Sequence, residues 1–140
     1  MKCLHGTWFE TKVRVPVNGK MTKKIYAVEA SCWSEAEANI LKYMRNNYEG
    51  DSCLDDIKKS PYIEICLSDE EDELNFYKVK VNFYEPSESG ALKKVPQTYL
   101  VEASSIQEAP KALASCLQDL EYEQVSVQKT NIYDILKREE

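Results

Sequence analysis

The chain has 140 residues, of which 43% are hydrophobic and 30% charged, and this composition excludes intrinsic disorder. It predicts one ordinary domain, or two small halves that share a core. No apolar run approaches the roughly 20 residues needed to span a bilayer, and the first six residues lack the apolar stretch of a signal peptide. We therefore expect a cytoplasmic location, which becomes the host cytoplasm if the protein is encoded by a phage.

The net charge of −6 is distributed unevenly along the chain. Residues 1–67 carry 10 basic and 9 acidic side chains, whereas residues 68–140 carry 8 basic and 15 acidic ones. Five of these acids form the run Asp69-Glu70-Glu71-Asp72-Glu73. Such a run repels itself and is too polar to pack, so we interpret residues 68–74 as an extended linker. The alternative is an acidic loop that binds a partner.

Strands are predicted at the start of the first half. Over residues 9–15 apolar and charged side chains alternate, which is typical of a half-buried strand. Asn18-Gly19 then predicts a tight hairpin turn into a second strand, which contains Tyr26 and Val28.

A helix is predicted to begin between Ser31 and Ser34, since Ser34-x-x-Glu37 has the form of a capping box. Its apolar residues recur at helical spacing and are Trp33, Ala36, Ile40, Met44 and Tyr48. A further strand contains Ile57. Residues 62–65 are expected to form a short strand that crosses to the other half of the chain.

The second half repeats these segments in the same order. Residues 8–15 match 76–83, residues 26–31 match 99–104, and residues 57–60 match 127–130. The second copy has a longer turn at 85–90 and a helix start near Ser105, and its last strand contains Val127. The helix stripe consists of Ile106, Ala109, Leu113, Leu117 and Leu120. Residues 132–135 are the second candidate for a crossing strand.

Three matched segments in the same order predict an internal duplication. The predicted fold is α+β, with two β-β-α-β repeats at residues 1–67 and 75–140 that are related by a pseudo-twofold axis. We expect an antiparallel sheet with the helices on one face, and a single compact unit. Small sheets have edges to protect, so we also expect a homo-oligomer.

These segments resemble a small, internally duplicated family of unknown function from Bacteroides-type bacteria and their phages. The resemblance covers almost the whole chain. The residues that carry it, each together with its counterpart in the second copy, are Trp8, Phe9, Lys12, Val13, Tyr26, Val28, Ala30, Glu35, Ala36, Ile57 and Lys59. It implies no established reaction and no catalytic residues. It does imply a phage or mobile-element setting.

The sequence predicts no enzyme, no cofactor and no metal site. His5 is the only histidine, so neither a catalytic triad nor a histidine-built metal site is expected, and a Cys3–His5 catalytic pair on the terminal segment is disfavoured. Five scattered cysteines without Cys-x-x-Cys spacing are interpreted as small buried side chains in a reducing compartment. Glu29 and Glu102 are matched by the repeat and form a candidate acid/base pair. We favour charge pairing with the strand lysines and arginine for both.

The candidate ligand-binding residues are basic and aromatic residues on equivalent strands of the two copies. They are Lys12, Arg14, Lys78, Lys80, Tyr26, Tyr99 and Trp8. A basic strand face with aromatic neighbours can hold an anion by charge and stacking. The alternative is a solvated, salt-paired face.

The leading hypothesis is a non-catalytic binding protein of a phage or its bacterial host. It would hold a small anionic ligand such as a nucleotide where the copies or subunits meet, and so sequester a host defence signal. One alternative is an inhibitor that binds a host protein through its acidic surface. Another is an accessory protein for single-stranded nucleic acid, which the acidic net charge makes less favourable.

Overall fold

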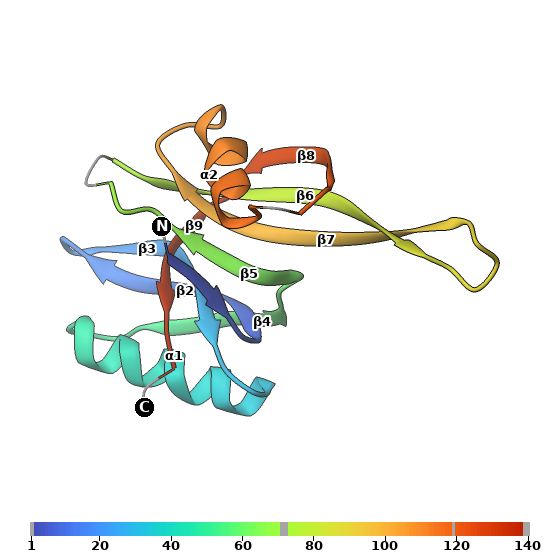
Figure 1. The fold of residues 1–140 in the computed structure, drawn as a ribbon. Coiled ribbons are helices and arrows are strands. Elements are labelled where there is room, and N and C mark those ends of the chain that lie inside the picture. Colours follow the sequence, from blue (N-terminus) through green and yellow to red (C-terminus); the bar gives the residue numbers. More distant parts are fainter. Residues whose placement is uncertain (1, 71–72, 119, 139–140) are drawn as a thin grey trace. The chain divides into compact units, whose positions relative to one another are not determined.

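The computed structural model describes residues 2–70, 73–118 and 120–138, and the described chain is mostly β-strand (Figure 1). It divides into two compact units that are not contiguous in sequence. Unit 1 comprises residues 1–5 and 62–130, and unit 2 comprises residues 6–61 and 131–140. The chain therefore passes from one unit to the other at three points. Of the acidic run, Glu71 and Asp72 lie outside the described residues.

Unit 2 is a four-stranded sheet with one helix. In spatial order its strands are β4 (Cys53–Lys59), β2 (Trp8–Val17), β3 (Lys20–Glu29) and β9 (Ile132–Leu136). The first three pair antiparallel, and β9 adds parallel to β3 from the far end of the sequence. The helix α1 (Trp33–Asn47) packs on this sheet.

Unit 1 has the same arrangement and one additional strand. In spatial order its strands are β1 (Lys2–His5), β5 (Tyr62–Leu67), β7 (Leu92–Ala103), β6 (Asn75–Pro86) and β8 (Glu123–Lys129). Here β5, from the first half of the sequence, adds parallel to β7, and β1 pairs antiparallel with β5. The helix α2 (Glu108–Cys116) packs mainly against β7.

These sheets show that the predicted fold class is wrong. The chain forms two mixed sheets, each with its own helix, and not an antiparallel sheet with both helices on one face. The reason is the exchange of the strands that follow each copy. Both β5 and β9 carry buried apolar residues, and each buries them by adding in parallel beside the long hairpin of the other half. The crossing predicted for residues 62–65 and 132–135 is confirmed.

The hairpin turns follow the predicted chemistry. Asn18 and Gly19 both have positive φ, 51° and 80°, and join β2 to β3 in a two-residue turn. Two central residues with positive φ define a type I′ turn, for which Asn-Gly is the favoured pair because its twist matches that of the strands. The longer loop between β6 and β7 closes with Gly90, whose φ is 84°.

The helix starts differ in part from prediction. Ser34 lies inside α1 rather than at its cap, and Glu35 instead accepts hydrogen bonds from the backbone N–H and the hydroxyl of Ser31. In the second copy the Ser105 hydroxyl accepts from the Glu108 N–H at 3.2 Å, as the capping pattern predicts. Pro110 occupies the first turn of α2, where its missing N–H is tolerated.

Each helix buries three small or aliphatic residues on its own sheet. These are Ala36, Ile40 and Met44 in α1, and Ala109, Leu113 and Leu117 in or just after α2. The outer members of the predicted stripes, Trp33, Ile106 and Leu120, are exposed. The apolar contact is therefore shorter than the sequence pattern suggests. No helix in the described ranges is long and apolar enough to cross a membrane.

The matched glutamates each hold the chain where an exchanged strand ends. The Glu29 carboxylate accepts from the Arg138 backbone N–H at 2.8 Å, just after β9. The Glu102 carboxylate accepts from the Ser68 backbone N–H at 3.0 Å, just after β5. These bonds are a different role from the pairing with strand cations that we favoured. A Cβ on Gly6 would lie 2.6 Å from a Glu29 carboxylate oxygen, so glycine is required beside this contact.

Candidate functional site

The basic strand face of unit 2 is exposed but partly salt-paired. Lys12 and Arg14 both project to solvent from β2. The Arg14 Nε lies 2.9 Å from a carboxylate oxygen of Asp55, and hydrogen bonding to that carboxylate raises the pKa of Arg14. Lys58 Nζ similarly lies 3.2 Å from Glu10. These two ion pairs are the arrangement of the salt-paired alternative.

The three aromatic candidates are buried. Trp8, Tyr26 and Tyr99 are 1%, 0% and 3% exposed. The Tyr26 hydroxyl hydrogen-bonds to that of Tyr48 at 2.7 Å, and burial raises the pKa of Tyr26. Burial also raises the pKa of Tyr99 to about 12. Their rings support the sheets and are not available for stacking on a ligand at the surface.

The second-copy lysines lie on β6 of unit 1, where Lys78 is half-buried and Lys80 is exposed. Lys12 and Arg14 belong to unit 2, so the predicted residues are divided between the two units. Their convergence on one ligand remains a prediction.

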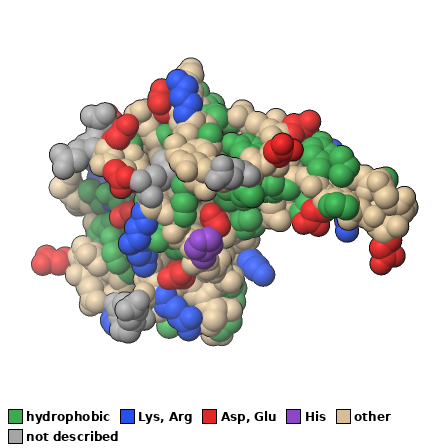
Figure 2. Space-filling view, viewed as in Figure 1, with side chains coloured by type: hydrophobic (Ala, Val, Ile, Leu, Met, Phe, Trp, Pro, Cys, Tyr) green, Lys and Arg blue, Asp and Glu red, His purple; other side chains and the backbone are tan. Residues whose placement is uncertain are grey.

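The only histidine is at the surface of unit 1 (Figure 2). His5 Nδ1 lies 2.9 Å from a carboxylate oxygen of Glu64, opposite it in the β1–β5 ladder. Cys3, two residues earlier, has its sulfur against other thiols. The two side chains therefore contact different partners.

A cavity of about 430 Å³ lies in unit 2, between α1 and β9. Its walls combine amide, amine, phenol and aliphatic side chains: Asn39, Lys42, Tyr43, Asn46, Asn47, Ile135, Leu136 and Lys137. Asn39 donates to the Glu29 carbonyl at 3.4 Å and Asn47 donates to the Tyr43 carbonyl at 2.8 Å. These bonds hold two amides in place and use one N–H of each.

The chemistry of this cavity suits a small anion or a polar ring. Two lysines provide positive charge, and the amides offer both donors and acceptors. The lysines also offset the partial negative charge of the α1 C-terminus, where the cavity lies. A smaller cavity of about 230 Å³ beside α2 in unit 1 includes Glu70, Glu102 and Glu108 in its wall, so it repels anions.

The sequence contains a pattern that indicates one wall of this cavity. Positions 39, 42, 43 and 46 follow helical spacing and place polar side chains along one stripe of α1. Only the apolar stripe of this helix was considered. Lys137 follows β9, and its place beside α1 depends on the strand exchange.

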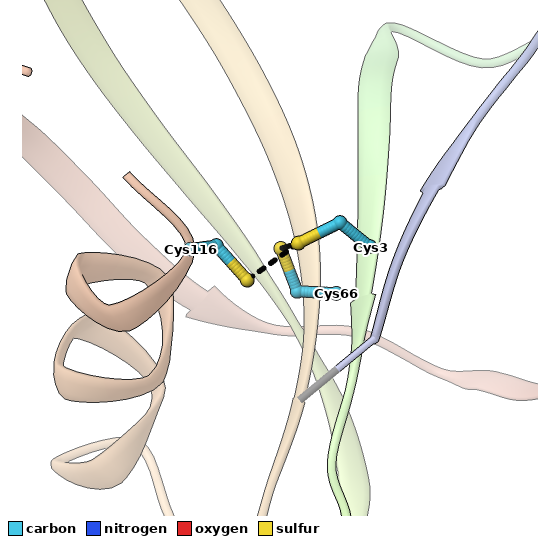
Figure 3. A group of neighbouring side chains, drawn as sticks. All are labelled: Cys3, Cys66 and Cys116. Atoms are coloured by element: carbon cyan, nitrogen blue, oxygen red, sulfur yellow. Dashed lines mark hydrogen bonds between the residues drawn. The ribbon is translucent and has the colours of Figure 1, made fainter. Parts of the chain in front are cut away.

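A second group of reactive side chains lies in unit 1, where three thiols meet (Figure 3). Cys3 comes from β1, Cys66 from the opposite position of β5, and Cys116 from the last residue of α2. The Cys3 sulfur lies 2.7 Å from that of Cys116 and 3.9 Å from that of Cys66. Burial raises the pKa of Cys66, and it raises that of Cys116 to about 11.

The sequence did not reveal this cluster because its members are 63 and 50 residues apart. They meet through the exchange of β5 and the addition of β1. The prediction of small buried cysteines is confirmed for Cys66, whereas Cys32 is exposed and the other three are half-buried. None of the five, all of which lie in the described ranges, is in a disulfide.

Comparison with known proteins gives one family match. A model described as "Domain of unknown function (DUF4494)" matches residues 7–138, which leaves β1 outside the matched region. No curated protein and no solved structure matches the chain.

Proposed function

The chain belongs to this DUF4494 family of unknown function, and we propose that it is a non-catalytic protein that binds a small anionic ligand in the cavity between α1 and β9. The observation that carries the proposal is a cavity whose polar wall is made of amides and two lysines. This site replaces the strand face as the primary candidate, because the aromatic residues predicted to stack on a ligand there, Trp8, Tyr26 and Tyr99, are buried.

The size of the cavity supports a ligand of mononucleotide dimensions. Pockets for small molecules are usually about 300–1,000 Å³ and combine an apolar wall with a few oriented polar groups. Here Ile135 and Leu136 form the apolar wall. Asn46 can contact a base edge, while Lys42 and Lys137 attract a phosphate.

In the phage or bacterial setting that the sequence resemblance implies, such binding would sequester a nucleotide signal of host defence. Sequestration needs affinity and no chemical step, so it agrees with a chain in which we expect no catalytic group. This biological role rests on the ligand proposal and is tested after it.

The test is a thermal-shift screen followed by calorimetry on the full chain. AMP, ATP, a cyclic mononucleotide and a cyclic dinucleotide are compared with adenosine, which has no phosphate. A ligand that binds only the folded state at 100 times its Kd stabilises it by about 2.7 kcal/mol, so a clear rise in Tm is expected. Adenosine should bind more weakly than its phosphorylated relatives.

Variants locate the site. Lys42→Ala and Lys137→Ala should each weaken binding by roughly tenfold or more, because a charge-assisted hydrogen bond contributes about 1.5–3 kcal/mol. Lys12→Ala is the matched control, since it removes one exposed lysine from the strand face of the same unit. If Lys12→Ala weakens ligand binding while Lys42→Ala and Lys137→Ala do not, the ligand binds at the strand face instead. No shift with any nucleotide or with inorganic phosphate would contradict the proposal.

The same screen separates the two alternatives. A short single-stranded oligonucleotide that binds and is released steeply with salt would indicate the accessory role in nucleic-acid binding. Capture of a basic host protein that depends on Asp69 and Glu73 would indicate the inhibitor role.

A further inference from the structure

The three thiols of unit 1 form a donor set that the ligand proposal does not use. Their sulfur atoms all lie within 4.8 Å of one another, although each comes from a different element. Zinc binds thiolate at about 2.3 Å, so three thiolates around one zinc ion lie roughly 3.8 Å apart. The Cys3–Cys66 distance of 3.9 Å already has this value, and the Cys3–Cys116 pair must open by about 1 Å.

A fourth donor lies on the same face of the β1–β5 pair. Side chains two residues apart on a strand point to the same side and are about 7 Å apart. His5 therefore projects on the side of Cys3, and Glu64 on the side of Cys66. His5 Nδ1 faces the Glu64 carboxylate at 2.9 Å, which leaves Nε2 as the ring nitrogen for a metal.

We propose that Cys3, Cys66, Cys116 and His5 form a zinc site of unit 1. Three sulfurs and one imidazole nitrogen are a common tetrahedral ligand set for a structural zinc ion. Glu64 acts through His5, because a histidine that binds metal usually donates its other N–H to a carboxylate, which fixes the tautomer and the ring orientation. His5 is not among the donors that lie within 4.8 Å of one another, so zinc binding requires its exposed side chain to turn until Nε2 reaches the ion.

The zinc site would connect the edge strand β1 to other elements of unit 1. Cys3 and His5 belong to β1, whose described sheet contacts are with β5 alone. A four-residue edge strand has little apolar surface of its own, and a zinc ion would link it to β5 and to the end of α2. The ion would thus join three elements that are distant in sequence, and its binding energy would add to the stability of unit 1.

The test uses the full chain, purified under reducing conditions without chelator, and Co(II) as a spectroscopic substitute for zinc. One Co(II) per chain is expected, with visible bands of a tetrahedral ion and strong thiolate charge-transfer absorption. Zinc should displace it at one equivalent, and competition with a chromophoric chelator gives the affinity. Zinc should also raise Tm.

Cys3→Ser and Cys116→Ser should each reduce the charge-transfer absorption by about one third. Each should also weaken zinc binding by more than the roughly 10–100-fold loss that follows mutation of a residue hydrogen-bonded to a metal ligand. Both positions are half-buried, so circular dichroism of each variant checks that it folds, and either variant alone tests the site. Cys53→Ser is the matched control, since Cys53 is also half-buried but lies in β4 of unit 2. It should bind like the parent.

His5→Ala separates the fourth ligand from the thiols. It should keep the full charge-transfer absorption, shift the visible bands and weaken zinc binding by at least tenfold. Unchanged bands and affinity in His5→Ala would overturn the assignment of His5. Absence of a 1:1 complex, or equal losses in Cys3→Ser and Cys53→Ser, would overturn the site.

Discussion

The two units place different side chains at matched positions of the same framework. The order β5-β7-β6-β8 in unit 1 corresponds to β9-β3-β2-β4 in unit 2, with one helix in each. Cys66 is aligned with Val101 in the ladder and Leu136 with Val28, so these two positions correspond. Cys116 and Tyr43 correspond as well, because each lies three residues after the central buried residue of its helix.

The added strand β1 is the main difference between the units. In unit 1 it covers the edge of β5 and adds Cys3 to the two other thiols. In the described part of unit 2 no strand lies on the outer side of β9, and a cavity lies between β9 and α1. One framework therefore offers a sulfur cluster in one copy and a polar cavity in the other. The core positions of the two units are alike, whereas the positions beside the exchanged strand differ.

The largest effect is expected from matched core substitutions. Ile40→Ala in α1 and Leu113→Ala in α2 remove equivalent, fully buried side chains, and each should lower the free energy of unfolding by about 2–5 kcal/mol. Denaturant unfolding measures this loss. Thiol labelling under native conditions then distinguishes the units, since Leu113→Ala should speed labelling of Cys66 more than Ile40→Ala does. Equal labelling rates would show that opening is shared by the whole chain.

The strand exchange is tested by the two glutamates. Glu29→Ala and Glu102→Ala each remove the acceptor for a backbone N–H at the end of an exchanged strand, and each should cost about 1–2 kcal/mol, because hydrogen bonds to charged groups contribute somewhat more than neutral ones. Amide hydrogen exchange is the direct readout. Glu29→Ala should expose the Arg138 amide and Glu102→Ala that of Ser68.

Glutamine is the matched control at both positions, since its side-chain oxygen still accepts. Loss of protection at both amides in either alanine variant would contradict separate roles for the two glutamates.

Local features of the fold were predictable from the sequence. The Asn18-Gly19 turn, the alternating strand at 9–15 and the buried stripe around Ile40 depend on neighbouring residues, and each was found at the expected place. The short apolar segments 62–65 and 132–135 were also recognised as crossing strands. The strands with which these two segments pair determine the sheets. Each segment pairs in parallel with a strand that is far away in the sequence.

The candidate sites were less predictable for the same physical reason. Tyr26 is buried because it lies on the strand face that packs against α1, whereas Trp8 is buried on the opposite face of β2. Their conspicuous recurrence therefore reflected burial rather than a ligand. Lys137 and Cys66 reach their sites on exchanged strands, so no local spacing marks them. The polar stripe of α1 was visible in the sequence, but it becomes a cavity wall only when β9 lies beside it.

The smallest effect on stability is expected from an ion pair just after β9 in unit 2. The described residues just after β5 in unit 1 do not form the equivalent pair. Arg138 Nε lies 2.7 Å from a carboxylate oxygen of Glu35, just after β9. The corresponding residues of unit 1 are Ser68 and Glu108, and Glu108 pairs instead with Lys111 within its own helix, at 3.4 Å. Hydrogen bonds from Ser31, and then the charge of Arg138, hold the pKa of Glu35 below its ordinary value of 4.5.

A carboxyl group whose pKa is lowered by folding stabilises the fold above its ordinary pKa and loses this effect as the pH falls through the lower, folded value. The parent should therefore be slightly more stable than Glu35→Gln at pH 7, and the two should converge as the pH falls below the lowered pKa of Glu35. Unfolding curves between pH 3 and pH 7 measure the difference. Glu108→Gln is the control, and it should show the smaller pH dependence because an exposed pair within one helix contributes little. If Glu108→Gln shows a pH dependence of stability as large as that of Glu35→Gln, then the ion pair of Arg138 gives the end of β9 no stability that the end of β5 lacks.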